Sequence, residues 1–329
     1  VFARITPCLE HGKIAVVKGL RENKGFGSSE YYVFREREGV SYRDYIYYLA
    51  ISPIVKGNAI VSMVGASGRQ RAQKDVIENT TVKVPDLPTQ KRVSLILSTY
   101  DDLVDNNRKR IQLLEELAWL LFREWFVYFR FPGHEKVHPI RKSNSNGVKI
   151  VDDVPEGWKK GLLADIAVVK KGRNITFEQA VEGDIPVVGG GLEPTYYHNK
   201  ANVSSPVITI SASGANAGYV NLYDTDIWAS DCSYIDKIST KHFYCLYLRL
   251  KSLQSTIFGL QVGAAQPHVY PKDLNRLSLL IAPDELCTQF EQLVTPIFYL
   301  IKNLKFENQK LAQARDLLLP RLMSGAIEV

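Results

Sequence analysis

Residues 89–126 contain the feature that most constrains this fold, a long run of apolar residues spaced three and four apart without proline or glycine. Such spacing predicts one helix with a narrow apolar seam, as in a coiled coil, rather than the wider stripe of an ordinary surface helix. The seam residues are Val93, Leu97, Tyr100, Val104, Ile111, Leu114, Ala118, Leu121 and Trp125, interrupted by Asn107. A helix of roughly 55 Å is far longer than usual, so we expect it to bridge two bodies. A long helix lying across one large domain is the alternative.

Residues 286–323 contain a second long run of apolar residues with the same spacing of three and four. Its seam residues are Phe290, Val294, Ile297, Ile301, Leu304, Asn308, Leu311, Arg315, Leu318 and Leu322. This seam also carries a central asparagine, and a buried amide at such a position fixes register and partner choice rather than adding stability. We therefore expect the two helices to pack antiparallel, with Asn107 and Asn308 near the shared seam.

Short segments before the first helix match short segments before the second helix, and the members of each pair are the same number of residues apart. The repeat therefore extends upstream of the helices. The matched segments are 45–49 with 243–247, 64–66 with 262–264, and 74–75 with 272–273. Chance could produce any one of these matches. Several at a single offset, each leading into a long helix, indicate a tandem duplication.

The duplication predicts two globular modules, each followed by a long helix. The expected parts are a first module at 1–88, a first spacer helix at 89–130, a linker at 131–154, a second module at 155–284, and a second spacer helix with the C-terminal tail at 285–329. The second module begins at Pro155, whereas Val1-Phe2-Ala3 matches residues near Val207-Ile208-Thr209. The first module is therefore expected to lack the opening part of its repeat, as in a fragment or a truncated gene product.

The composition, with 45% hydrophobic and 23% charged residues, is that of a folded chain with sizeable cores. The net charge of +6 is compatible with a polyanionic partner without identifying one. Four scattered cysteines form no C-x-x-C pair, so they indicate a reducing compartment rather than a zinc site or a disulfide framework. The sequence shows neither a membrane-spanning run nor a signal peptide. We expect a cytoplasmic protein with no membrane partner and no metal.

In the first module, the loop at 67–74 reads SGRQRAQK and gathers cations and amides on a short segment. Arginine can bind guanine bidentately, glutamine can bind adenine, and lysine neutralises phosphate. The loop therefore predicts DNA contacts, and the candidate residues are Arg69, Gln70, Arg71 and Lys74. A solvated polar loop explains the same composition equally well.

In the second module, basic and amide side chains recur in the loops and in the segment that follows the last of them. The candidate residues are Lys170, Lys171, Arg173, Asn174, Asn216, Gln266, His268 and Lys272. Gln266 and His268 match the neighbourhood of Gly68–Gln70 in the repeat. Because loops carry function while strands carry the core, we expect 170–174, 214–216 and 266–268 to form one DNA-binding surface. For 170–174 a plain exposed turn is the alternative.

Motifs for chemistry are missing from the sequence. It has no N/D-P-P-Y/F or F-x-G-x-G methyltransferase motif, no Walker A, no convincing P-D…E-x-K nuclease site and no G-x-S-x-G elbow. The glycines at 189–191 lack the spacing of a nucleotide-binding loop and favour a β-turn. We therefore expect no catalytic residue and no cofactor. Two modules held apart by two similar helices suit the measurement of a fixed distance.

Several short motifs stand in a characteristic order along the chain. They are P-E-G-W at 155–158, G-A-A-Q-P at 263–267, Pro283 leading into the Gln289 helix, and the helix endings at 115–126 and 318–325. Together they resemble the specificity subunit of a type I restriction–modification system, over nearly the whole chain. The resemblance implies an α+β fold, a tandem repeat of two mixed α/β target recognition domains joined by two long antiparallel coiled-coil helices.

The same resemblance implies a non-catalytic subunit that reads a bipartite site on double-stranded DNA. Its implied partners are two adenine-modification subunits, with restriction (translocase) subunits joined through the complex. A spacer of order 50 Å would place the modules about one to two turns of B-DNA apart. The alternative is a two-lobed adaptor that binds only proteins through its helices. Salt-dependent DNA binding separates these two readings, and methyl transfer by the chain alone would indicate a third, a freestanding methyltransferase.

Overall fold

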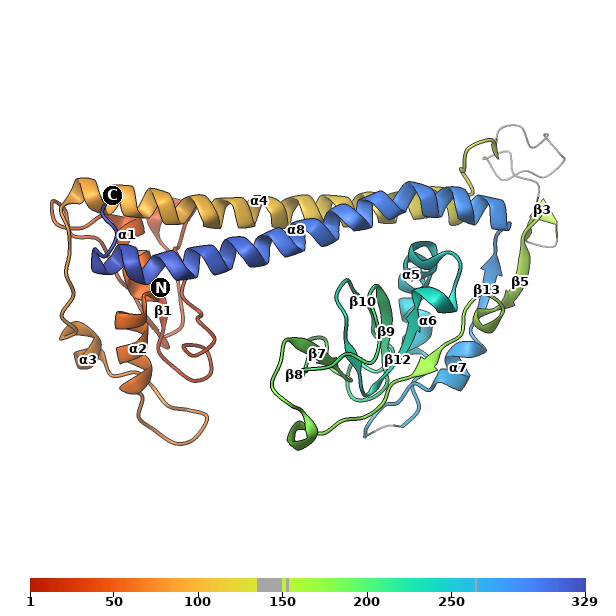
Figure 1. The fold of residues 1–329 in the computed structure, drawn as a ribbon, viewed down its shortest axis with the longest axis horizontal. Coiled ribbons are helices and arrows are strands. Elements are labelled where there is room, and N and C mark those ends of the chain that lie inside the picture. Colours follow the sequence, from red (N-terminus) through yellow and green to blue (C-terminus); the bar gives the residue numbers. More distant parts are fainter. Residues whose placement is uncertain (135–149, 152–153, 264) are drawn as a thin grey trace. The chain divides into compact units, whose positions relative to one another are not determined.

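The computed structural model describes residues 1–134, 150–151, 154–263 and 265–329 (Figure 1). The predicted linker at 131–154 lies mostly outside these described residues. The chain forms two compact units, residues 1–110 with 304–329, and residues 111–303. Each unit therefore contains one globular module and one part of each long helix. No helix in the described part of the chain is long and apolar enough to cross a bilayer.

Both long helices predicted from the seam pattern are present. Helix α4 spans Leu87–Phe126 with 40 residues, and α8 spans Asp284–Ser324 with 41. The Asp86 carboxylate precedes α4 and accepts a hydrogen bond from the Thr89 N–H at 3.0 Å, which satisfies one free donor of the first turn. Gly325, at φ +75°, ends α8, and the Ala326 N–H returns to the Arg321 carbonyl at 2.9 Å, as in a glycine-terminated helix.

The module of the first unit is small, and its regular secondary structure is mainly helical. Its elements are β1 (Phe2–Ala3), η1 (Arg21–Asn23), β2 (Tyr31–Tyr32), α1 (Arg43–Ile51), α2 (Pro53–Val61) and α3 (Lys74–Glu78). Strands β1 and β2 pair over only two residues each. Residues 18–30 are rich in glycine and charge, so they offer no alternating apolar face for a longer ladder. The core residues are Phe2, Leu9, Ala50, Val55, Ala59 and Ala72.

Within the first unit, α4 and α8 run antiparallel. Their shared apolar cluster contains Val93 and Leu97 from α4 and Leu319 and Leu322 from α8. Further along α4, Asp101 pairs with Arg315, which comes earlier on α8. The Tyr48 hydroxyl of α1 also donates to Asp101, at 2.7 Å, so the module is fixed to the helix pair.

Within the second unit, an aromatic cluster joins the two helices. Phe290 of α8 is fully buried, and its ring meets Phe122 and Phe126 of α4 edge-on, with centroids 6.1 and 4.9 Å apart. The cluster extends back along α4 and forward along α8 through Ile111, Leu114, Ala118, Val294, Ile297, Phe298 and Ile301. The order is again antiparallel. Trp158, at the start of the second module, packs on Phe126.

The second module is built on a four-stranded antiparallel sheet in the order β10-β9-β12-β6. Its strands are β6 (Lys170–Lys171), β9 (Val207–Ser211), β10 (Val220–Tyr223) and β12 (Cys232–Asp236). All five residues of β9 are buried. Ile208 and Ile210 pack in the cluster of helix α5 (Phe243–Ser252), while Val207 packs in a separate cluster on the opposite face.

The remaining elements complete this module. The sheets are β11-β7-β8, β13-β5 and β3-β4, formed by β3 (Ile150–Val151), β4 (Val154–Pro155), β5 (Lys159–Leu162), β7 (Ile185–Val188), β8 (Tyr196–His198), β11 (Trp228–Ala229) and β13 (Ser278–Ile281). The short helices are η3 (Leu163–Asp165), η4 (Phe177–Gln179), η5 (Lys237–Ser239), α6 (Gln254–Phe258) and α7 (Pro271–Asn275). Strand β13 leads directly into α8 and pairs with β5, so both ends of the module meet beside that helix.

Candidate nucleic-acid interface

In the first unit, the basic loop closes against the end of β1. Val64 and Arg71 exchange backbone hydrogen bonds of 3.1 and 2.9 Å, which close the loop on itself. The Thr6 N–H donates to the Gln70 carbonyl at 2.9 Å, and the Ala72 N–H donates to the Arg4 carbonyl at 2.7 Å. The loop base is therefore fixed to the segment that follows β1, and its tip extends beyond.

The second unit repeats this arrangement bond for bond. Val262 and His268 exchange two backbone hydrogen bonds of 2.9 Å. The Gly214 N–H donates to the Pro267 carbonyl at 3.0 Å, and the Val269 N–H donates to the Ala212 carbonyl at 2.9 Å. The duplication inferred from sequence is thus visible as one loop scaffold present in both modules.

These bonds correct the residue correspondence read from the sequence offset. By backbone pairing, His268 is the equivalent of Arg71, and Gln266 is the equivalent of Arg69. The constant offset had matched Gln266 and His268 with Gly68 and Gln70, one residue before their true equivalents. The reason is that the loop from Val64 to Arg71 is one residue longer than the loop from Val262 to His268. The same bonds make Ala3 the equivalent of Ser211, whereas the sequence matched Ala3 with a residue near Thr209.

A glycine with positive φ opens each loop. Gly65 has φ +132° and Gly263 has φ +102°, values that side-chain-bearing residues rarely adopt. A Cβ atom would lie 3.1 Å from the Arg69 carbonyl in the first loop and 2.9 Å from the Gln266 carbonyl in the second. Glycine is therefore required for the chain to fold back under the residue at each loop tip.

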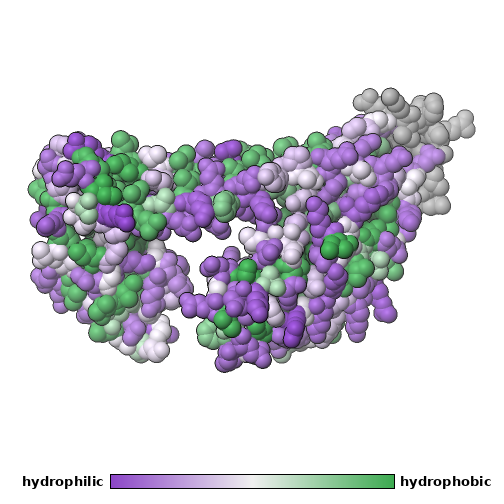
Figure 2. All heavy atoms as spheres, viewed as in Figure 1, coloured by the Kyte–Doolittle hydropathy of each residue, from purple (hydrophilic) through white to green (hydrophobic). Residues whose placement is uncertain are grey.

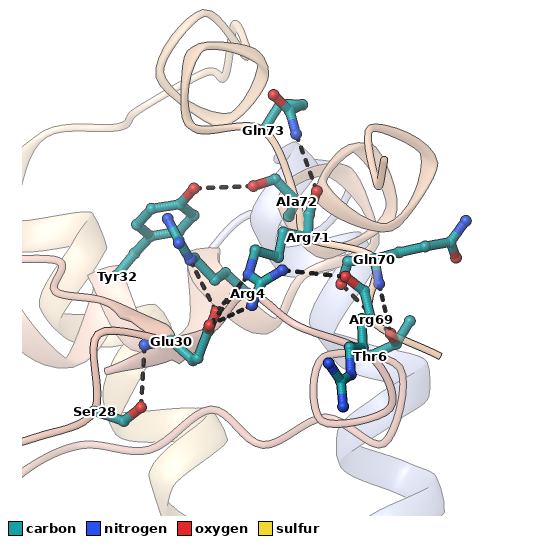
Figure 3. A network of polar contacts seen from close by, with 10 residues as sticks. All are labelled: Arg4, Thr6, Ser28, Glu30, Tyr32, Arg69, Gln70, Arg71, Ala72 and Gln73. Carbon is teal, nitrogen blue, oxygen red and sulfur yellow. Dashed lines mark hydrogen bonds and ion pairs between the residues drawn. The ribbon is translucent and has the colours of Figure 1, made fainter. Parts of the chain in front are cut away.

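At the base of the first loop, two arginines converge on Glu30 (Figure 3). Arg71 donates to both carboxylate oxygens, from Nη2 at 2.7 Å and from Nε at 3.0 Å, and the Arg4 Nε lies 3.2 Å from Oε2. The hydrogen bonds from Arg71, and then those from Arg4, hold the pKa of Glu30 below its usual value. Arg71 is therefore held in a bidentate pair and positions the loop rather than offering a free charge.

The tip of the first loop is freer. Arg69 is exposed, and its side chain has no ion-pair partner in the part of the chain that the structure describes. The Gln70 side chain extends away from the Glu30 cluster (Figure 3), while its backbone N–H is bound by the Thr6 hydroxyl. Lys74 lies beyond the loop in α3 and pairs with Glu78 at 3.1 Å, an exposed contact that is weak in water.

In the second unit, the three predicted loops converge where strands of the four-stranded sheet begin and end, a region called here the sheet edge. Strands β6 and β9 end there and β12 begins there, because both run antiparallel to β12. The Gly172 N–H donates to the Cys232 carbonyl at 2.8 Å, and the Ala212 N–H donates to the Asp231 carbonyl at 3.2 Å. The His268 bridge to Ser213 brings in the third loop. Segments 170–174, 214–216 and 266–268 therefore lie around the start of β12.

The cations on this edge differ in how free they are. Lys170 donates to Asp236 at 2.7 Å and lies over the Tyr234 ring, so its charge is already neutralised. Its neighbour Lys171 is exposed and, among the described residues, has no ion-pair partner. The side chains of Arg173, Asn174 and Gln266 are also exposed, and Arg173 likewise has no ion-pair partner among the described residues. The side chain of Asn216 is half-buried.

An aromatic platform follows the third loop. The His268 ring stacks on Tyr270 with centroids 5.9 Å apart, and the Lys272 ammonium lies 5.5 Å from the Tyr270 centroid. Tyr270 is 43% exposed, so one cation and two flat rings are presented together to solvent. The sequence pointed to His268 and Lys272 but missed Tyr270 between them.

Sequence reasoning also missed the acids that organise both sites. Glu30 holds the first loop, and in the second unit Asp231 accepts a hydrogen bond from the Ser213 hydroxyl. Nothing in the local sequence marks either acid, because their partners lie far along the chain. Gly190 gave a local signal that was read only as a turn; a Cβ atom there would lie 2.4 Å from the Ser213 carbonyl.

The predicted seam residues all lie at least partly inside the helix pair. Those that are buried are Val93, Leu97, Val104, Asn107, Ala118, Trp125, Phe290, Val294, Ile301, Leu304 and Leu322, and those that are half-buried are Tyr100, Ile111, Leu114, Leu121, Ile297, Asn308, Leu311, Arg315 and Leu318. The narrow seam missed Phe122, Phe126 and Phe298, which widen the apolar face in the second unit. In the described part of the chain, no group of three or more His, Cys, Asp or Glu side chains could hold a metal ion.

Comparison with known proteins gives consistent matches. A family model of the type I restriction modification DNA specificity domain matches residues 12–116 and 155–314, most of the chain. The type I restriction enzyme MjaIX specificity subunit of Methanocaldococcus jannaschii is 26% identical, over 97% of this chain and 76% of that protein. The HindI specificity subunit of Haemophilus influenzae is 21% identical, over 77% of this chain and 70% of that protein. The S subunit structure from M. genitalium shares the fold, with a TM-score of 0.56 at 18% identity over 85% of this chain and 72% of that one.

Proposed function

The chain belongs to the type I restriction–modification DNA specificity family, and from this premise we propose that each module reads one part of a bipartite site on double-stranded DNA. Specificity subunits are non-catalytic, so methyl transfer to adenine comes from partner subunits. In this proposal two modification subunits dock on the chain, and restriction subunits join through the complex. Helices α4 and α8 set the length of the unread gap between the two parts of the site.

The observation that carries this proposal is the loop scaffold that both modules share. The backbone of the loop is fixed in the same way twice, while the side chains at equivalent positions differ. Arg69 stands where the second module has Gln266, and Arg71 stands where it has His268. Arginine suits guanine and glutamine suits adenine, so one scaffold would give two different base preferences.

Free and bound cations take different roles in the second module. Lys171 and Arg173 are exposed at the sheet edge, which suits contacts to phosphates that set register without reading sequence. Lys170 is neutralised by Asp236, so we assign it to folding of the edge rather than to DNA. Gln266, exposed at a loop tip, is the candidate for reading a base edge.

Exposed leucines on α4 provide a surface for the modification subunits. Leu113, Leu117 and Leu120 are 64%, 45% and 46% exposed and recur at spacings of four and three, on one face of the helix. Apolar residues interrupt the polar surface along the long helices in Figure 2. A partner helix with a matching apolar stripe would cover this face, as in other helix-in-groove contacts.

In the alternative, an adaptor, the helices bind partner proteins and the loops do not contact DNA. Measuring how tightly the protein binds a DNA duplex separates the adaptor from the proposal. The duplex carries the sequence that the complex is found to methylate. The proposal expects affinity that falls steeply with salt and exceeds that for a scrambled duplex. Binding of the partner subunits with no preference for that duplex at any salt concentration would favour the adaptor.

Two substitutions then separate base reading from phosphate contact. Gln266→Ala should weaken binding to the correct site by about 1–3 kcal/mol and relax preference at one base pair. Lys171→Ala should weaken all sequences alike and reduce the salt slope by about one unit. Lys170→Ala is the matched control, because its charge is already paired with Asp236. If Gln266→Ala and Lys171→Ala both bind like the unaltered chain, the surface is misplaced.

A further inference from the structure

Two cysteines meet where the second module joins its spacer helix. Cys245 lies in the first turn of α5 and Cys287 in the first turn of α8. One turn after Cys287, the Glu291 carboxylate accepts hydrogen bonds from the backbone N–H groups of Tyr244 at 3.0 Å and Cys245 at 2.9 Å. Residues four apart share a helix face, so Cys287 projects from α8 towards the same end of α5.

The two side chains meet in one apolar cluster, in which Cys245 is buried and Cys287 packs against the buried residues. The interaction between the two thiols raises the pKa of Cys245 and lowers the pKa of Cys287. Burial opposes the effect on Cys287, the Arg249 guanidinium assists it, and Asp284 and Glu291 oppose it weakly. Cys287 is therefore the thiolate-forming partner, and Cys245, 3% exposed, is placed to resolve an oxidised intermediate.

A small reagent can reach this pair. Both cysteines line a cavity of about 430 Å³, together with Lys241, His242, Arg249 and Asp284. The Arg249 guanidinium favours the ionised form of the Cys287 sulfur, and the cavity is large enough for peroxide. Cys232 has no such setting, because it is buried and its pKa is raised to about 12 by burial.

We propose that Cys245 and Cys287 form a peroxide-sensitive dithiol whose disulfide ties the second recognition module to α8. The Cys287 thiolate attacks one oxygen of hydrogen peroxide, the O–O bond breaks, and a sulfenic acid and hydroxide form. The Cys245 thiol then attacks the sulfenic sulfur, which forms the S–S bond and releases water. Two thiols lose two electrons in total, and one peroxide becomes two waters.

The bond would join the core of the module to the spacer. Helix α5 packs through Phe243, Leu246 and Leu250 into the main cluster of the module, whereas Cys287 belongs to α8. Closing this loop of roughly forty residues restricts the unfolded chain, so the melting temperature of the oxidised protein should rise by about 5–10 °C. Oxidation would therefore stiffen the joint between the second module and the helix that carries it.

The test uses the full chain, reduced and then treated with hydrogen peroxide. Peptide mapping should find a Cys245–Cys287 cross-link, with Cys8 and Cys232 still free and the free thiols reduced from four to two. A dithiol reagent should reverse the bond and the shift in melting temperature. The inference does not depend on DNA binding, so the two can fail separately.

Variants identify the order of the two steps. In Cys245→Ser, Cys287 should retain a sulfenic acid that dimedone traps, whereas in Cys287→Ser the Cys245 thiol should be slow to react. Cys232→Ser is the matched control and should form the cross-link normally. Equal reaction of Cys8 and Cys287 without a cross-link, or a cross-link formed only after denaturation, would overturn the proposal.

Discussion

The seam asparagines give a quantitative test of the helix pairing in the first unit. Asn107 is 2% exposed, and its Nδ2 donor has no hydrogen-bond partner among the described residues. The Oδ1 acceptor of Asn308 is also buried and, within the same described set, unpartnered. Counting from the Asp101–Arg315 pair, Asn107 lies six residues along α4 and Asn308 seven residues back along α8, so the amides are level.

We predict that replacing both asparagines with leucine stabilises the protein. Each buried polar atom without a partner costs about 1–3 kcal/mol. Two such atoms are removed, and part of the gain is lost to imperfect packing of the larger leucines. The free energy of unfolding should therefore rise by about 2–4 kcal/mol, with a smaller change for either single substitution. The cost of the native amides would be offset by a unique register.

Urea unfolding followed by far-ultraviolet circular dichroism measures this change. Asn106→Leu is the matched control, because Asn106 is exposed one position away, and it should stay within about 0.5 kcal/mol of the unaltered chain. A double variant less stable than the unaltered chain would refute the reasoning. That result would mean that the amides satisfy one another in solution and contribute stability as a pair.

Two further predictions concern the joint of the second unit. Phe290→Ala should lower the free energy of unfolding by about 3–5 kcal/mol, since Phe290 is fully buried against three aromatic rings. Tyr299→Ala, 64% exposed on the same helix, is its control, and equal losses would contradict the packing. Burial raises the pKa of Glu291, so the folded state binds this proton more tightly than the unfolded state. The stability that the protonated Glu291 side chain contributes is fully present below its unfolded-state pKa near 4.5. It is lost as the pH rises through the raised pKa of Glu291 in the folded state. Melting temperatures from pH 4 to 7 should therefore fall more for the unaltered chain than for Glu291→Gln, and parallel curves would disprove this assignment.

The sequence predicted the long helices well because their signal is local. Spacing of three and four over dozens of residues has few structural solutions, and Asn107 and Asn308 stood out as the polar members of their seams. The fixed offset also led to equivalent loops in both modules. It matched His268 one residue too early, because an inserted residue in a loop changes the count without changing the scaffold.

Contacts between distant residues were beyond the sequence. Glu30 meets Arg71 through tertiary folding, and no pattern around either residue announces the pair. Lys170 and Lys171 read as equivalent cations, yet the pleat of a strand sends them to opposite faces and only Lys170 meets Asp236. The pairing of Cys245 with Cys287 was hidden for the same reason, as was the burial of β9 on both faces.

Mapping of methylated adenines in cells that make this chain with its modification subunits tests the central claim most directly. The account predicts one methylated sequence with two short fixed parts, separated by a gap of constant length and arbitrary sequence. Gln266→Ala should relax a position in only one of the two parts, because it lies in the second module. Methylation of a single continuous sequence, or a Gln266→Ala pattern altered in both parts at once, would contradict the account.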